Sequence, residues 1–408
     1  MSDIFIPFGG GGSIKTPDGK EYVANVVPVI EETAYGPGSL PDVIRTKSTA
    51  NLYMCHPFAA QNSFKDGDYY YFVSPSSSGG KAFVSKWTVS PLECIAVLEL
   101  TGSGSLHIYA WANACIGEDY FYIQTYVATT MTDICLYKIQ KSTMTVSGTL
   151  ANYKATSISS GGPWVIGDYL YMIGDKAAGQ ILKIAKSNLS VQTFTVGAVV
   201  TCTTFSVTGE DSSANLVIGV MDNTQTIKTV TFHVYSSALS LVGTYTFESP
   251  SAVNLNYIMR DLNIPGFVSY GPVVIFDIRS IPITANWMPV TNNYSANSYS
   301  YTRGTETTKV YCLGFIYPAF DTGDQNKIRF FAELDLINNS YEIIALRKNI
   351  ILTHAYFMPG FMSKQEITSA LGGAGLPIIG SSSGAANQFG RAGFKSRAES
   401  YSFYTEKL

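Results

Sequence analysis

Short runs of alternating apolar and polar residues, separated by Gly, Asp and Ser turns, extend along most of the 408-residue chain. The clearest set begins at the turn Asp66-Gly67 and continues in an aromatic run over 68–73. Two further strand-like runs follow at 82–89 and 92–100. Strand, turn, strand, tight turn and strand is the pattern of an antiparallel meander. We therefore predict three antiparallel strands in this segment.

The same unit returns at a nearly constant interval. Gly67, Gly117 and Gly167 stand 50 residues apart, and each precedes an acidic residue and an aromatic run. Glycine supplies the positive φ that a tight turn needs, and aromatic residues suit a pleated, half-buried strand. These glycines therefore mark where successive units begin. Further strands of the same kind are predicted over 215–220, 272–278 and 309–316.

The second half of the unit repeats as well, as two strand-like runs joined by a short polar connection. Six units of three or four strands, with a period of ~40–50 residues, are typical of propeller blades. A sandwich or jelly roll is the alternative, but neither requires so regular a spacing. We predict an all-β chain folded as a β-propeller of six antiparallel blades, with room for a seventh split between the two ends. The polar connections fall at 141–143, 186–188, 236–238 and 338–340.

The blades are predicted over residues 21–359, between two arms. Residues 1–20 form a flexible N-terminal arm in which an apolar peptide precedes four glycines, so that the peptide is free to dock elsewhere. Residues 360–408 leave the strand pattern as a C-terminal tail with one short helix over 364–371, where Ser363 and Glu366 form a capping box. The residues expected to attach the arms to neighbouring subunits are Ile4, Phe5, Ile6 and Phe8 in the N-terminal arm and Phe394, Arg397, Tyr401, Phe403 and Tyr404 in the tail.

Two further predictions concern ring closure and binding. A strand from one terminus usually joins a blade built from the other, and either 22–30 or 52–56 is expected to be that strand. Residues 282–303 interrupt the period with a mixture of Tyr, Ser and Asn that resembles adaptable binding loops. The candidate receptor- or glycan-binding residues in that insert are Trp287, Tyr294, Tyr299 and Tyr301.

Composition narrows the classes of partner. Charged residues make up 14% of the chain, against about 25% in an ordinary soluble domain, and the formal net charge of −3 gives no sign of a nucleic-acid partner. No apolar run approaches the ~18 residues of a membrane span, and the N-terminus lacks a signal peptide's basic start and apolar core. The six cysteines are scattered, as in a chain that folds in a reducing cytoplasm. We predict no membrane insertion and no signal-dependent secretion.

No catalytic set emerges from the sequence. Gly380 to Gly384 imitates a nucleophile elbow, but no His follows it. Asp68, Asp119 and Asp168 recur with the blades, beside the turn glycines, where they are expected to form turns. The four His share no metal-binding spacing with one another or with Cys. We predict no enzyme activity, no cofactor and no metal site.

The opening residues Ser2 to Gly12, the low charge, the scattered Cys, the Tyr/Ser/Thr strands and the Gly/Ser/Ala tail together resemble bacteriophage virion proteins of the tail, neck and nozzle type. The resemblance implies a structural component of a phage particle, in the tail or at its attachment, assembled in the host bacterial cytoplasm. Its partners would be other virion proteins and copies of itself. The alternative is a receptor- or glycan-binding propeller that contacts the host surface, and a polysaccharide-degrading propeller ranks third.

Overall fold

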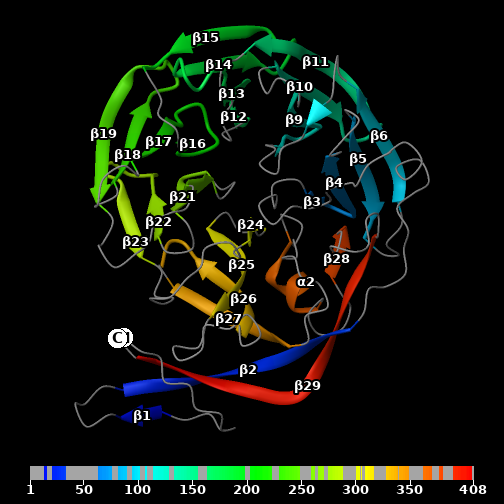
Figure 1. Ribbon diagram of the computed structural model, residues 1–408, viewed down its shortest axis with the longest axis vertical. Helices are drawn as coiled ribbons and strands as arrows, with labels where there is room; N and C mark the ends of the chain where they lie inside the picture. The colour runs from blue at the N-terminus through cyan, green and yellow to red at the C-terminus, as the bar shows by residue number, and fades with distance from the viewer. Residues whose placement is uncertain are drawn as a thin grey trace.

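Antiparallel sheets stand side by side around a common centre, each presenting a short strand to the middle and a longer one to the rim (Figure 1). The chain is a β-propeller, with six such blades in the part that the structure describes. The computed structural model describes residues 13–15, 21–33, 63–75, 81–89, 94–101, 106–107, 114–127, 133–154, 163–197, 203–222, 229–248, 259–261, 265–270, 274–287, 300–303, 305, 308–316, 328–338, 340–348, 362–369, 376–379 and 389–406.

The first three blades are built from consecutive segments of the chain. Blade one comprises β3 (Ser63–Asp66), β4 (Tyr69–Pro75), β5 (Lys81–Thr88) and β6 (Cys94–Thr101). Blade two comprises β7 (Leu106–His107) and β8 (Ala114–Ile116), which both pair with β9 (Tyr120–Val127), then β10 (Asp133–Gln140) and β11 (Thr145–Lys154). Blade three comprises β12 (Trp164–Ile166), β13 (Tyr169–Ile173), β14 (Gln180–Ala185) and β15 (Val191–Thr195).

The next three blades follow the same order. Blade four comprises β16 (Thr203–Val207), β17 (Leu216–Asp222), β18 (Thr229–Tyr235) and β19 (Leu241–Glu248). Blade five comprises β20 (Met259–Asp261), β21 (Phe267–Tyr270), β22 (Val274–Asp277) and β23 (Thr284–Trp287). Blade six comprises β24 (Ser300–Arg303), β25 (Lys309–Ile316), β26 (Ile328–Asp335) and β27 (Ser340–Lys348).

Tight turns join the first and second strands of the blades, as the glycine period predicts. Gly67 and Gly167 have φ of 57° and 54°. Gly117 does not have a positive φ, so the conformation predicted there is wrong; Glu118 and Asp119 stand in this turn where the other two have a single Asp. The unit predicted over 272–278 is placed one strand too late, because that range holds β22, the third strand of blade five. The turn that opens β21 is at Gly266, with φ of 91°. Gly266 leads directly into Phe267 without the acidic residue that marked the other turns, so the pattern did not find it.

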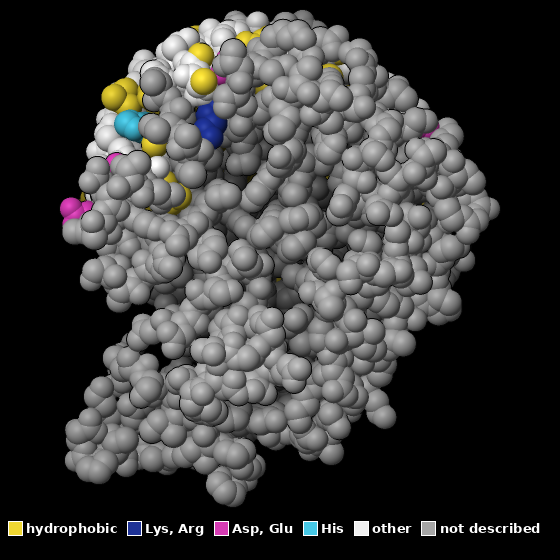
Figure 2. All heavy atoms as spheres, viewed as in Figure 1, with side chains coloured by type: hydrophobic (Ala, Val, Ile, Leu, Met, Phe, Trp, Pro, Cys, Tyr) yellow, Lys and Arg dark blue, Asp and Glu magenta, His cyan; other side chains and the backbone are white. Residues whose placement is uncertain are grey.

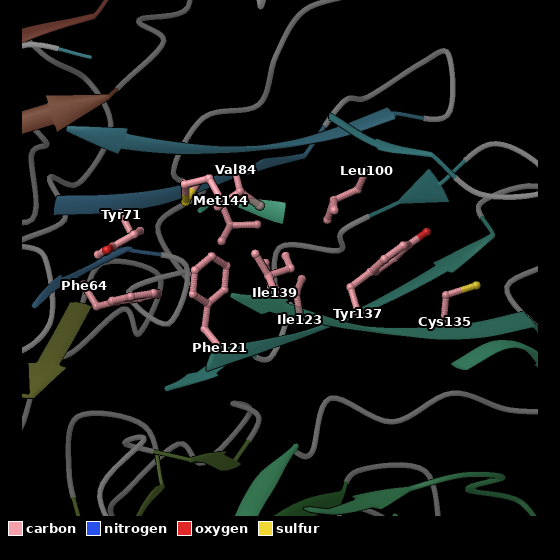
Figure 3. Close-up of a cluster of buried hydrophobic side chains, with 11 residues drawn as sticks. Phe64, Tyr71, Val84, Leu100, Phe121, Ile123, Cys135, Tyr137, Ile139 and Met144 are labelled. Atoms are coloured by element: carbon pink, nitrogen blue, oxygen red, sulfur yellow. The ribbon is translucent and has the colours of Figure 1, made fainter. Parts of the chain in front are cut away.

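Apolar side chains fill the space between neighbouring blades. Between blades one and two, Phe64 stacks on Tyr71 with ring centroids 5.2 Å apart, and Phe121 meets both rings (Figure 3). Equivalent clusters lie between blades two and three, three and four, and four and five. Blades two, three and four are therefore buried on both faces, which explains why their strands are rich in aromatic and β-branched residues.

In blades two, three and four, one apolar residue of the outer turn has a left-handed backbone conformation. Met144, Leu189 and Leu239, in blades two, three and four, have φ of 53°, 59° and 62°. Each packs into the cluster shared with the preceding blade. The left-handed conformation costs roughly 1–2 kcal/mol for an L-residue, and burial of a large apolar side chain returns ~1.5–3 kcal/mol. The hairpins predicted around 141–143, 186–188 and 236–238 are confirmed.

The two ends of the chain meet outside blade six. β2 (Glu21–Thr33) pairs in parallel with β27, where Val29 lies opposite Leu346. Its other edge pairs antiparallel with β29 (Phe389–Glu406), which in turn pairs with β28 (Leu376–Ile379). β1 (Ser13–Lys15) lies against the start of β2. An N-terminal strand thus joins the last blade, as predicted for 22–30, but it adds to four strands already present; the alternative at 52–56 lies outside the described residues.

The prediction that residues after 359 contain no strand is wrong, because β28 and β29 lie there. Charged residues interrupt the apolar alternation of β29, and its partner β2 comes from the other end of the chain, so no local pattern reveals the pairing. The predicted helix is present as α2 (Lys364–Ser369). Of the N-terminal arm, Ser13–Lys15 forms β1, and residues 1–12 and 16–20 lie outside the described residues.

Candidate functional site

A lysine joins each of the first two blades to the blade that follows it; Lys86 is buried and Lys138 is half-buried. Lys86 of β5 lies over the Tyr69 ring, with Nζ 3.9 Å from the centroid, and donates a hydrogen bond of 3.3 Å to the carbonyl of Lys141 in the outer turn of blade two. Lys138 of β10 repeats the contact one blade later and donates to the carbonyl of Lys186 at 2.7 Å. We call this contact the lysine clasp. It pairs the lysine ammonium with a tyrosine ring and a turn carbonyl at the crowded interface between two blades.

In β26 of blade six, Glu333 occupies the position that Lys86 and Lys138 occupy in blades one and two. It lies three residues before the outer turn. Glu333 is buried, with 6% of its surface exposed, and it lies 3.4 Å from Nζ of Lys309. Its other cation is Lys364 of α2, at 3.5 Å. The sign of the charge is therefore reversed at the junction where the ring must close, and the partner is a helix instead of a blade turn.

Helix α2 spans the junction between blade six and blade one (Figure 1). Lys364 donates to Glu342 of β27 at 2.6 Å, and Glu366 lies 2.9 Å from Lys65 of β3. Ile367 is fully buried. The helix therefore holds the last blade through one side and the first blade through the other, in the place that an outer turn takes at the other junctions.

The predicted capping box positions this helix. The Ser363 hydroxyl accepts a 3.2 Å hydrogen bond from the Glu366 N–H, and the Ser363 N–H donates to the Glu366 carboxylate at 2.9 Å. Partial burial alone would raise the pKa of Glu366, but the hydrogen bonds from Lys65 and Ser363 outweigh it and hold the pKa below its ordinary value. The hydrogen bond to Glu342 raises the pKa of Lys364. Both groups are thus charged at neutral pH.

The ribbon, defined here as β1, β2 and β29, runs along the outer side of blade six and past it (Figure 1). β29 follows β2 from Gly393, opposite Thr33, to Glu406, opposite Tyr22. Its second edge pairs with β28 only over 389–392. From 393 to 406, that edge has no strand partner among the described residues.

A bulge divides β29 in two. Pro28 lies opposite Ser400 and Ile30 opposite Ser396, so that three residues, 397–399, face Val29 alone. Extra residues in one strand bend it and increase its twist. The regular stretch after the bulge, Ser400–Glu406, is the part that lies beyond the contact of β2 with β27.

Apolar residues occupy both faces of the ribbon. Residues that lie directly opposite in an antiparallel pair share a face. Tyr401 therefore shares one face with Val27, and Tyr404 shares the other with Ala24. A ribbon of so few strands gains little stability by itself in water, and its pairing with β27 covers only Val29–Glu31.

The structure separates the predicted receptor-binding residues. Trp287 ends β23, the rim strand of blade five, and Tyr301 lies in β24, the central strand of blade six. Tyr294 and Tyr299 lie outside the described residues, as does all of 288–299. The insert predicted over 282–303 is therefore shorter, since its two ends are blade strands. Sequence reasoning read these ends as loop because the strands are only four residues long.

The predicted attachment residues of the tail all lie in β29. Phe403 lies opposite Asn25, Phe394 opposite Glu32, and Arg397 falls in the bulge. The corresponding residues of the N-terminal arm, Ile4, Phe5, Ile6 and Phe8, lie outside the described residues. The tail residues are thus brought together with β2, a pairing that the sequence did not predict.

The described residues show groups placed for structure. The backbone carbonyls of Asp68, Asp119 and Asp168 accept hydrogen bonds of 2.9–3.1 Å from the backbone N–H of Val89, Lys141 and Lys186, which extends the pairing of neighbouring strands. Burial raises the pKa of the Cys94 thiol to about 11, so the thiol is protonated at neutral pH. Within the described part of the chain, no group of three or more His, Cys, Asp and Glu could hold a metal ion. No described helix is long and apolar enough to cross a membrane.

Exposed apolar side chains also occur at the rim of blade four. Figure 2 shows hydrophobic side chains beside a histidine where Figure 1 places β18 and β19. Leu241 and Val242 of β19 are 58% and 48% exposed. The His233 ring lies 3.4 Å from the Thr244 hydroxyl. Scattered exposed apolar residues are ordinary on protein surfaces, so this rim alone indicates no partner.

Comparison with known proteins assigns no family to this chain. No protein-family model and no curated protein matches the chain. Among solved structures, the WD40 domain of SCAP from fission yeast is similar over 74% of this chain, with 9% sequence identity and a TM-score of 0.31. The chain spans 66% of the length of that structure.

Two parts of the site escaped sequence reasoning. The clasp has a visible signal, because Lys86, Lys138 and Lys183 stand at equivalent places before the outer turns of blades one to three. Glu333 stands at the same place in blade six, so the reversed charge could have marked the closing junction. The β2–β29 pairing has no comparable signal.

Proposed function

We propose that the chain is a non-enzymatic structural component of a bacteriophage particle, in the tail or at its attachment, acting through protein–protein contacts. The propeller serves as a rigid body, and the ribbon serves as its attachment. The low charge, the scattered Cys and the Gly/Ser/Ala tail support the phage assignment by resemblance. The partners are other virion proteins and copies of the chain itself.

One observation carries the attachment role. In the part of the chain that is described, the sheets of five blades end at their own last strand, whereas the sheet of blade six continues outward through β2 and β29. This extension contributes no strand to the six blades, so it is not needed to complete them. An extended strand edge and two apolar faces are the features by which proteins add strands from a partner.

The test is the solution mass of the full-length protein by light scattering, beside a variant that lacks residues 389–408. The deletion starts after α2, because removing all of 360–408 would also remove the helix that joins blade six to blade one. We expect several copies in the full-length protein and a folded monomer in the variant, with unchanged hydrogen exchange in β12–β19. A full-length chain that is monomeric at every concentration, and binds no other particle protein, would refute the proposal.

A further inference from the structure

Among the described residues, the edge of β29 over Ser400–Glu406 has no strand partner. Natural proteins shield such edges with short length, lysine, proline or bulges. The rim strands β15 and β23 are only five and four residues long, whereas β6, β11 and β19 have eight to ten residues. The segment 400–406 contains no Lys and no Pro, and Glu406 is its one charged residue. The bulge lies before this stretch and leaves it regular.

We propose that a second copy of the chain covers this edge, with Ser400–Glu406 of the two copies paired antiparallel about Phe403. The proposal rests on the proposed function and names the partner that the ribbon takes. The bulge sets the register, because two copies use the whole regular stretch only when Ser400 of one lies opposite Glu406 of the other. The remaining opposed pairs are Tyr401 with Thr405, Ser402 with Tyr404, and Phe403 with Phe403.

This register places residues opposite each other in favourable pairs. Tyr401 and Thr405 form an aromatic and β-branched pair, which is favourable across antiparallel strands. Glu406 lies opposite Ser400, so no like charges meet. A two-fold axis through Phe403 makes the surface complementary to itself, as in most protein dimers. The joined sheet would contain β1, β2 and β29 from both copies, which is enough strands for independent stability.

The aromatic residues set an upper limit on the area of this contact. Each copy contributes three of them, Tyr401, Phe403 and Tyr404. An aromatic side chain buries roughly 150–250 Å² when it is fully covered, so six of them give an upper limit of about 900–1,500 Å². A specific interface needs about 1,000 Å² in total, so the paired backbone edges have to supply part of the contact.

Disulfide trapping tests the register. In the full chain with Phe403→Cys, the two new cysteines lie opposite each other, with Cα atoms about 4.5–5.5 Å apart, inside the range of a disulfide. The matched control is Ser400→Cys, whose two cysteines lie about 20 Å apart in the same pairing. Mild oxidation should convert most of the Phe403→Cys protein to a covalent dimer, identified by its linked peptide. The Ser400→Cys protein and the parent should stay near background.

A second variant keeps the test informative if a cysteine perturbs the ribbon. Phe403→Lys places two like charges at the axis, whereas Thr405→Lys places one opposite Tyr401. We expect the first to weaken self-association at least tenfold by light scattering, and the second much less. Equal trapping of the two cysteine variants, or equal effects of the two lysines, would overturn the self-pairing. If ribbon deletion still abolished assembly with other particle proteins, the proposed function would stand without it.

Discussion

Replacing Ile367 by alanine should loosen the ring at one junction only. Ile367 is fully buried on α2, between blades six and one. Truncating a buried Ile to Ala costs about 2–5 kcal/mol, because the lost apolar contacts leave a cavity. The ion pair of Lys65 with Glu366 is partly exposed and contributes only ~0.2–1 kcal/mol. Packing of the helix, more than its charges, should therefore decide how tightly the ring closes.

The assay is urea unfolding together with hydrogen exchange, and Thr368→Ala is the matched control. Thr368 is exposed on the same helix, and its hydroxyl donates only to helix carbonyls. We expect Ile367→Ala to lower the unfolding midpoint and to speed exchange in β3 and β25–β27, while β13–β18 keep their protection. Thr368→Ala should change the free energy of unfolding by less than ~0.5 kcal/mol. Equal effects of the two variants, or uniform loss of protection, would refute the closing role of α2.

Three further outcomes can be measured. Gly179→Ala should destabilise by more than ~3 kcal/mol in chemical denaturation, because a Cβ there would lie 1.3 Å from the carbonyl oxygen of Gly197. Gly197→Ala has open space but a φ of 107°, so backbone strain alone should cost ~1–3 kcal/mol. Lys138→Met should cost ~1–2 kcal/mol by the same assay, through the lost bond to Lys186. Folding lowers the pKa of Glu366. Its contribution to folding stability is therefore complete above pH ~4.5 and is lost as the pH falls further. In Glu366→Gln, a pH titration of the unfolding midpoint should show a smaller loss of stability in acid.

Local signals predicted the blades well. The turns at Gly67 and Gly167 and the hairpins at 141–143, 186–188 and 236–238 depend on residues close in sequence, and the structure confirms them. The capping box likewise predicted α2, since Ser363 and Glu366 are three residues apart. Blade five was misplaced by one strand where Gly266 lacks the usual acidic neighbour.

Contacts between distant segments could not be predicted in the same way. β2 and β29 select each other from opposite ends of the chain, and nothing in either strand alone specifies the register that places Phe403 opposite Asn25. The role of α2 depends on Lys65 and Glu333, which belong to the first and last blades. The candidate attachment residues were identified in part from composition, but their common strand became visible only in the fold.

The pairing of β2 with β29 also sets an order of events during synthesis. β2 leaves the ribosome before any blade, and its partner β29 follows after all six blades. Each blade can form from its own continuous segment as it emerges, since domains and their parts fold during synthesis. The ribbon can form only after both β2 and β29 have been synthesised. A chain interrupted within the blades would lack this pairing, so under the proposed function an incomplete product could not attach to its partners.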